Sequence, residues 1–166
     1  MSSYRASSRF GLLIALAVAT LSSLAAAPPG TENPKGRPAP GYVTVAITHR
    51  VFLDFHDTLT VTMNERHVVG DTEYTFEMVE FYPDFAIDTN KAVTSVSDEP
   101  ANPAFKVAVF EGKEKADDTW AFYGIDIPHY GRKSYLAFKV LAFEYRGEHI
   151  GKAGDTPAAT SEEKQQ

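Results

Sequence analysis

The chain has 166 residues, of which 43% are apolar and 23% charged, and its formal net charge is −6 at neutral pH. These values fit a single globular domain and differ from the composition of disordered chains. The sequence has no cysteine, which excludes disulfides, thiolate metal sites and cysteine nucleophiles. The acidic balance argues against a nucleic-acid partner, because binding one requires basic side chains that neutralise phosphates.

Residues 1–25 have the pattern of a secretory signal peptide, with two arginines, a short apolar run (Phe10–Ala19) and then small residues. The apolar run is shorter than the roughly 20 residues that a membrane span requires. Small side chains at Ser23 and Ala25 predict cleavage after Ala25, and an uncleaved N-terminal anchor is the alternative. We therefore expect an exported protein, periplasmic or secreted, with no direct membrane span after signal cleavage.

Two further segments flank the expected domain. Residues 26–41 contain five prolines and three glycines, a composition that does not support a regular ladder of hydrogen bonds and predicts a linker. Residues 151–166 contain no large apolar side chain, which predicts a disordered tail. The folded body is expected over residues 42–150.

Within this body, apolar residues recur at every second position, which is the period of a β-strand with one buried face. Both faces of residues 134–145 are largely apolar, as is typical of a central strand covered on both sides. Glycine-containing turns separate the apolar runs, and no segment has the period of an amphipathic helix. The sequence therefore predicts an all-β fold, an antiparallel β-sandwich or barrel-like sheet pair of about six to eight strands.

Residues 76–105 (FEMVEFYPDFAIDTNKAVTSVSDEPANPAF), followed by KVAVFEG and DDTWAFYGIDIP, combine a strand, an irregular excursion, a proline-rich turn and a second strand. This arrangement resembles the periplasmic β-domain of ResB-like cytochrome c biogenesis proteins and of small uncharacterised exported relatives. The resemblance covers about a third of the chain and implies a role in haem delivery or apocytochrome handling. ResB-like proteins carry several transmembrane helices, so this chain would correspond to their soluble module. It contains no haem-ligand motif that would transfer from the family.

The residues of this stretch also have an explanation of their own. Pro83 lacks an amide hydrogen and should end the strand before it, so that the aromatic residues on either side pack at the edge of the core. Trp120 is expected to seal one end of the sandwich. Core packing explains such aromatic side chains, and a binding surface is the alternative. On that alternative, the interaction candidates are Tyr82, Asp84, Phe85, Trp120 and Tyr130.

Patterns for catalysis or for a bound cofactor are missing from the sequence. The five histidines have no spacing typical of a metal site, and His67 and His129 are the candidates that remain if two ligands converge across strands. There is no GxSxG elbow, no GxGxxG and no phosphate-binding loop. We expect no enzyme activity and no cofactor.

Two functions fit these observations. The first is a non-catalytic exported β-domain that binds a protein partner or helps assemble a complex in the cell envelope, and the resemblance implies a cytochrome-related complex. An edge strand such as Tyr42–Thr48 would pair with the partner by strand addition. The alternative is a periplasmic carrier of a small ligand or metal, with His129 and Tyr130 near Trp120 at an open end of the sandwich.

Overall fold

The computed structural model describes residues 32–33 and 37–152. The predicted signal peptide, residues 1–25, lies outside the described residues, as does most of the predicted tail. The part of the chain that is described contains strands and no helix, so the all-β prediction is confirmed. It accordingly has no helix with the length and apolarity that a bilayer crossing requires.

The strands follow one another along the chain with only turns and loops between them. Several are short, and the longest are β6, β10 and β11. They are β1 (Glu32–Asn33), β2 (Arg37–Pro38), β3 (Val43–His49), β4 (His56–Val61), β5 (His67–Val68), β6 (Tyr74–Tyr82), β7 (Phe85–Ile87), β8 (Val93–Ser95), β9 (Ala104–Glu111), β10 (Glu114–Tyr123), β11 (Leu136–Tyr145) and β12 (Glu148–Gly151).

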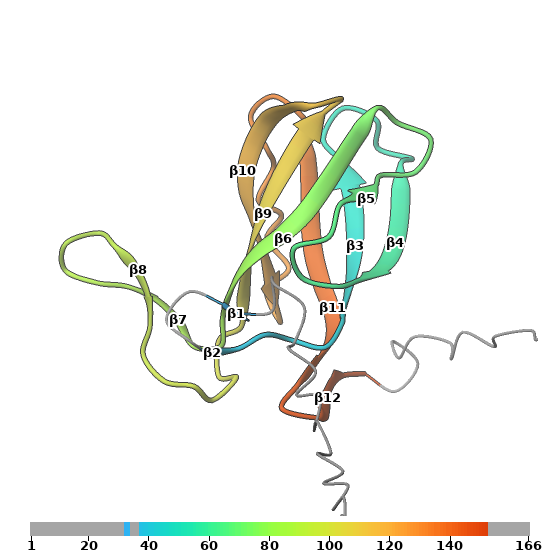
Figure 1. Ribbon diagram of the computed structural model, residues 1–166. Coiled ribbons are helices and arrows are strands. Elements are labelled where there is room, and N and C mark those ends of the chain that lie inside the picture. Colours follow the sequence, from blue (N-terminus) through green and yellow to red (C-terminus); the bar gives the residue numbers. More distant parts are fainter. Residues whose placement is uncertain (1–31, 34–36, 153–166) are drawn as a thin grey trace, which may run out of the picture.

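The main sheet curls into a nearly closed barrel (Figure 1). Its strands lie in the order β4-β3-β11-β10-β9-β6-β5, and β12 adds to β11. The gap between the two ends of this order narrows where the segment after β4 meets β6. There Met63 forms an isolated β-bridge with Met78, and the Asn64 amide donates to the Met78 carbonyl at 2.9 Å. The barrel-like form is thus the one that the chain adopts.

The hairpin of β7 and β8 stands apart from the barrel as a second, small sheet and projects from it in Figure 1. It leaves the barrel directly after β6, which ends at Tyr82. Pro83 therefore ends the strand as its missing amide hydrogen predicts.

Two details of the predicted topology are wrong. Strands β10 and β11 are parallel, with Ala121 opposite Phe138, whereas every other pair of named strands is antiparallel. The segment expected as a free edge, Tyr42–Thr48, corresponds to β3, which pairs with β11 on one side and β4 on the other. A parallel pair needs a crossover rather than a tight hairpin. Residues 124–135, here called the crossover, make that connection.

The interior of the barrel is filled by side chains from alternate positions of the strands, and most of them are completely buried. Phe81, which is 1% exposed, has its ring centroid 4.8 Å from Phe105, 5.8 Å from Phe143 and 5.1 Å from Tyr145. We call these four residues the inner aromatic cluster. Register shifts in β6, β10 and β11 mark bulges, which bend strands and help a sheet to close.

The body begins before residue 42. Pro40 is buried, the Gly41 amide donates to the Glu144 carbonyl at 3.0 Å, and Arg37 forms an ion pair with Asp98. The last residues of the segment expected as a linker therefore contact the barrel.

Candidate binding surface on the outer face of the barrel

Side chains that alternate with the core cover the outer face of the barrel. Because neighbouring residues of a strand point to opposite faces, burial of Phe81 in the interior directs Glu80 and Tyr82 outward. The same parity directs Trp120 and Phe122 outward around Ala121, which is completely buried. The strands β6, β9 and β10 are neighbours, so these outward side chains form one continuous surface.

Four aromatic side chains meet on this surface, and we call them the outer aromatic row: Tyr82, Phe85, Trp120 and Phe122. Ring centroids lie 5.7 Å apart for Tyr82 and Trp120, 5.1 Å for Phe85 and Trp120, and 5.4 Å for Phe85 and Phe122. Three of the predicted interaction residues are thus brought together. Trp120 lies on the outer face and does not close an end of a sandwich, which corrects the expectation for it.

A polar network fixes one end of the outer aromatic row. The Tyr82 hydroxyl donates to the Glu80 carboxylate, and Lys106 Nζ lies 2.9 Å from the same carboxylate. Burial, followed by the hydrogen bond to Glu80, raises the pKa of Tyr82 to about 12. Burial alone would raise the pKa of Glu80, but the hydrogen bonds from Tyr82 and Lys106 outweigh it and lower that pKa. Glu80 therefore stays charged and Tyr82 neutral over the physiological range.

Asp84, another predicted interaction residue, forms hydrogen bonds to residues near the hairpin of β7 and β8. Its carboxylate accepts a hydrogen bond from the Ser97 hydroxyl at 3.0 Å, and its amide donates to the Ser95 hydroxyl at 2.9 Å. These contacts tie the base of the hairpin of β7 and β8 together, so Asp84 has a structural role here.

The crossover is anchored by side chains of β10 that lie beyond the end of the parallel pairing. The Asp117 carboxylate accepts hydrogen bonds from the amides of residues 132–134, the shortest being 2.7 Å from Ser134, and the Thr119 hydroxyl donates to the His129 carbonyl at 2.7 Å. Burial alone would raise the pKa of Asp117, but the hydrogen bonds from Ser134 and its neighbours lower it. A Cβ at Gly131 would lie 2.6 Å from Asp117 Oδ2, so the backbone approaches too closely for a side chain.

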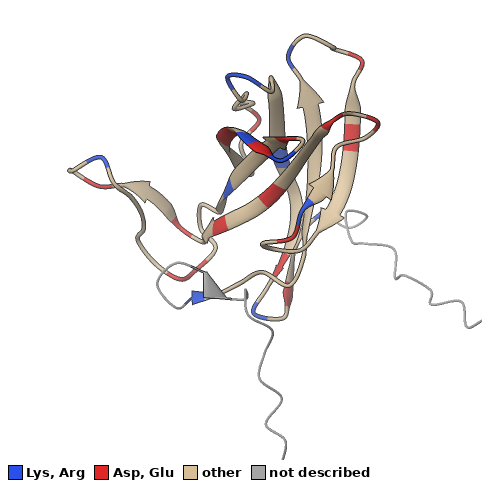
Figure 2. Ribbon diagram, turned by 45° about the horizontal axis from the view of Figure 1, so that its top comes forward, with Lys and Arg blue, Asp and Glu red and all other residues tan. Residues whose placement is uncertain are grey.

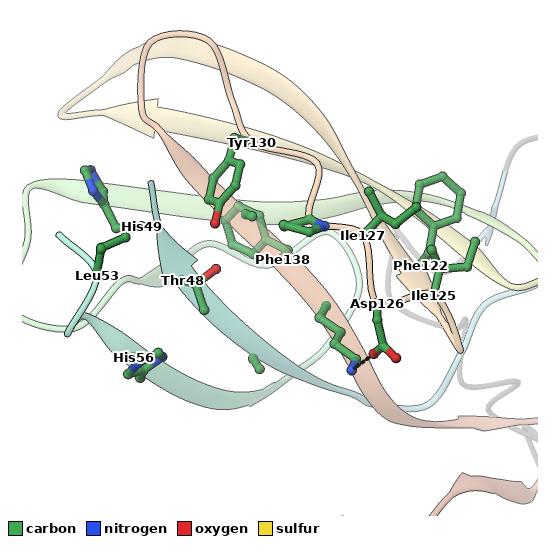
Figure 3. Close-up of a pocket in the computed structure, with 14 residues that line it drawn as sticks. Thr48, His49, Leu53, His56, Phe122, Ile125, Asp126, Ile127, Tyr130 and Phe138 are labelled. Carbon is green, nitrogen blue, oxygen red and sulfur yellow. Dashed lines mark hydrogen bonds and ion pairs between the residues drawn. The ribbon is translucent and has the colours of Figure 1, made fainter. Parts of the chain in front are cut away.

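A pocket of about 310 Å³ lies between the crossover and the outer faces of β3 and β11 (Figure 3). Its floor is made of small side chains, because Ala46, Thr48 and Ala137 occupy the outward positions of the two strands. Tyr130 extends over it from the crossover, with its hydroxyl toward Thr48 (Figure 3). We call this cavity the crossover pocket. Its other lining residues are His49, Leu53, His56, Phe122, Ile125, Asp126, Ile127, Pro128, Phe138 and Lys139.

Two polar features of the crossover pocket have fixed roles. His49 Nδ1 accepts hydrogen bonds from the amides of Val51 and Phe52 at 3.1 and 3.0 Å, so the proton of the neutral ring is on Nε2, which is left as a donor. Lys139 of β11 forms an ion pair with Asp126 of the crossover, drawn as a dashed line in Figure 3. This pair links the two walls of the pocket.

A ridge of exposed apolar side chains borders the crossover pocket. Val51, Phe52 and Leu53, in the loop between β3 and β4, are 61%, 68% and 76% exposed, and we call them the apolar ridge. Ile127, on the crossover, is 72% exposed. A second hollow of about 250 Å³ lies on the Phe52 side. Contiguous exposed apolar groups of this kind mark interaction sites.

The two predicted metal ligands lie on different elements. His67, on β5, packs against Phe76 with ring centroids 5.8 Å apart, and His129, on the crossover, packs against Phe122 at 4.8 Å. Within residues 32–33 and 37–152, no group of three or more histidine, aspartate and glutamate side chains is arranged to hold a metal ion.

Residues of both charges occur over the whole barrel. Acidic and basic residues are interspersed over the strands and loops (Figure 2), and Lys139 with Asp126 is one of the ion pairs among them.

Sequence reasoning missed most of the pocket. It singled out Tyr130, but not His49, Leu53, Asp126 or Lys139. One signal was available, because the apolar run Val51–Leu53 falls between two alternating segments, where a turn would ordinarily be polar.

Comparison with known protein families, with curated proteins and with solved structures found no match for the chain. The resemblance of residues 76–105 to ResB-like domains therefore remains an expectation from the sequence.

Proposed function

We propose that the chain is a non-catalytic, exported binding domain that recognises an apolar segment of a protein partner in the cell envelope. The observation that carries the proposal is the apolar ridge, in which three consecutive large side chains are each more than half exposed. Single exposed apolar residues are common on protein surfaces, whereas contiguous ones next to a hollow favour binding by burial of apolar area.

The cellular setting of the proposal comes from the sequence. The signal-like residues 1–25 support export, and the resemblance of residues 76–105 to ResB-like domains favours a cytochrome-related complex as the assembly in which the partner takes part. The apolar ridge supports binding whichever envelope protein the partner is.

The test compares capture of envelope proteins by three forms of the exported protein: wild type, Phe52→Ser combined with Leu53→Ser, and Val68→Ser. Val68 is an exposed apolar residue of β5, 58% exposed, and serves as the matched control. We expect one protein to be captured by wild type and Val68→Ser and reduced at least about tenfold by the ridge variant, because each buried anchor contributes about 1–2 kcal/mol. Equal capture by all three forms would contradict the proposal.

The alternative function, a carrier of a small ligand, is favoured by the crossover pocket. Its volume of about 310 Å³ is at the lower end of the range of about 300–1,000 Å³ found for ligand sites. Apolar walls with a few polar groups, here Tyr130 and Lys139, are the usual lining of such sites.

A further inference from the structure

We propose that the crossover pocket binds a small apolar molecule that carries a carboxylate, with Lys139 as the partner of the carboxylate. This inference gives the carrier alternative a ligand class, and it does not depend on recognition of a protein at the apolar ridge.

The body of the ligand would occupy the apolar part of the pocket. Ala46 and Ala137 form a flat floor of small side chains, and Ile125, Ile127 and Leu53 contribute apolar walls. The volume of about 310 Å³ corresponds to about ten water-sized groups at ~30 Å³ each. A short hydrocarbon chain or a single aromatic ring fits this space.

Several polar groups of the pocket can donate a hydrogen bond, which fits a ligand with an acceptor. Lys139 offers its ammonium group, and Tyr130 and Thr48 offer hydroxyls. The carboxylate in the lining is that of Asp126, whose side chain is 88% exposed.

Positive charge exceeds negative charge at the mouth of the pocket. A neighbouring hollow of about 290 Å³ shares Asp126 and Lys139 with the crossover pocket and adds Lys152. The hydrogen bond and charge of Lys139, with a smaller contribution from Lys152, lower the pKa of Asp126. Two lysines therefore act on one carboxylate at this point, which leaves a net charge complementary to an anion.

The ion pair between Asp126 and Lys139 gives the proposal a specific consequence. A bound carboxylate would replace Asp126 as the partner of Lys139, so Asp126 competes with the ligand. Removing the negative charge at Asp126 should then strengthen binding, whereas removing the positive charge at Lys139 should weaken it. With a purely apolar ligand, the two substitutions would not change the affinity in opposite directions.

The experiment titrates the exported, purified protein with octanoate and with 1-octanol, following amide chemical shifts by NMR. The two probes have the same chain length and differ in the charged group. We expect octanoate to bind about tenfold more tightly than 1-octanol, with shifts in residues 125–130, in β3 and in residues 137–139 of β11. Lys139→Gln should abolish this difference, and Asp126→Asn should raise the affinity for octanoate about threefold.

A second ion pair of the barrel provides matched controls. Lys115 and Asp118 are 49% and 46% exposed and pair at 2.6 Å on β10, close to the 47% exposure of Lys139. Lys115→Gln and Asp118→Asn should leave octanoate binding unchanged. Phe52→Ser should also leave it unchanged because Phe52 does not line this pocket, which separates this test from that of the partner proposal.

Three outcomes would overturn the inference. The first is the absence of saturable octanoate binding by the folded wild-type protein. The second is equal affinity for the two probes, with Asp126→Asn and Lys139→Gln acting in the same direction, as a neutral apolar site predicts. The third is binding accompanied by shifts confined to residues outside the crossover, β3 and β11.

Discussion

The inner aromatic cluster and the outer aromatic row use the same kinds of side chain for different ends. Phe81 and Tyr82 are consecutive residues of β6, yet Phe81 packs among other rings inside the barrel while Tyr82 contacts Trp120 and bonds to Glu80 on the outer face. Phe81, Phe105 and Phe143 pack against one another inside the barrel, whereas the outer rings adjoin Glu80, the crossover and a pocket. Strand parity, and not residue type, therefore decides which aromatic residues fill the barrel interior and which lie on its outer face.

The largest effect on stability should come from removing a large side chain from the barrel interior. Phe81→Ala removes a ring that is 1% exposed and contacts three others. We expect the free energy of unfolding to fall by about 3–5 kcal/mol, measured by urea denaturation. A loss below about 1 kcal/mol would show that the cluster packs loosely and would weaken the contrast with the outer row.

The second effect concerns the anchor of the crossover. Asp117→Asn replaces a carboxylate that accepts from the amides of residues 132–134 with an amide that also presents donors to them. We expect the free energy of unfolding to fall by about 2 kcal/mol at pH 7, measured by chemical denaturation. Amide chemical shifts should change more in the crossover than in the barrel.

The pH dependence of this second effect follows from the lowered pKa of Asp117. A carboxylate with a depressed pKa in the folded state contributes stability above its unfolded pKa and loses it as the pH falls through the folded pKa. The difference in the free energy of unfolding between wild type and Asp117→Asn should therefore be largest at neutral pH and become smaller in acid. A difference that stays constant into acid would mean that the charge of Asp117 does not contribute.

The smallest effect should come from the outer row. Tyr82→Phe keeps the ring and removes the hydroxyl that donates to Glu80, which still has Lys106 as a partner. We expect the free energy of unfolding to fall by about 1 kcal/mol, again measured by urea denaturation. A loss comparable to that of Phe81→Ala would mean that the outer row is part of the core.

Local sequence pattern was sufficient for the strands in which apolar and polar residues alternate regularly. The alternation in β3 and β6 and the stop at Pro83 could be predicted because they depend on neighbouring residues alone. The parallel pairing of β10 and β11 could not, since a loop such as residues 124–135 has the same local composition whether it turns back or crosses over. The free edge expected at β3 was wrong for the same reason, as its second partner, β11, lies far along the chain.

The aromatic residues of the outer face could be predicted from the sequence. Tyr82, Phe85 and Trp120 stood out as large rings near an interrupted strand, and the fold brings them together. Asp126 and Lys139 carried no signal because they belong to the crossover and to β11, and their pairing depends on the topology.

The central claim is that the apolar ridge contacts a partner while the barrel interior only stabilises the fold. The most direct measurement is photo-crosslinking in intact cells with a photoreactive residue at position 53 and, as control, at position 68. The account predicts one discrete crosslinked product from position 53 and none of that mass from position 68. The same product from both positions, or none from position 53 in a folded and exported protein, would contradict it.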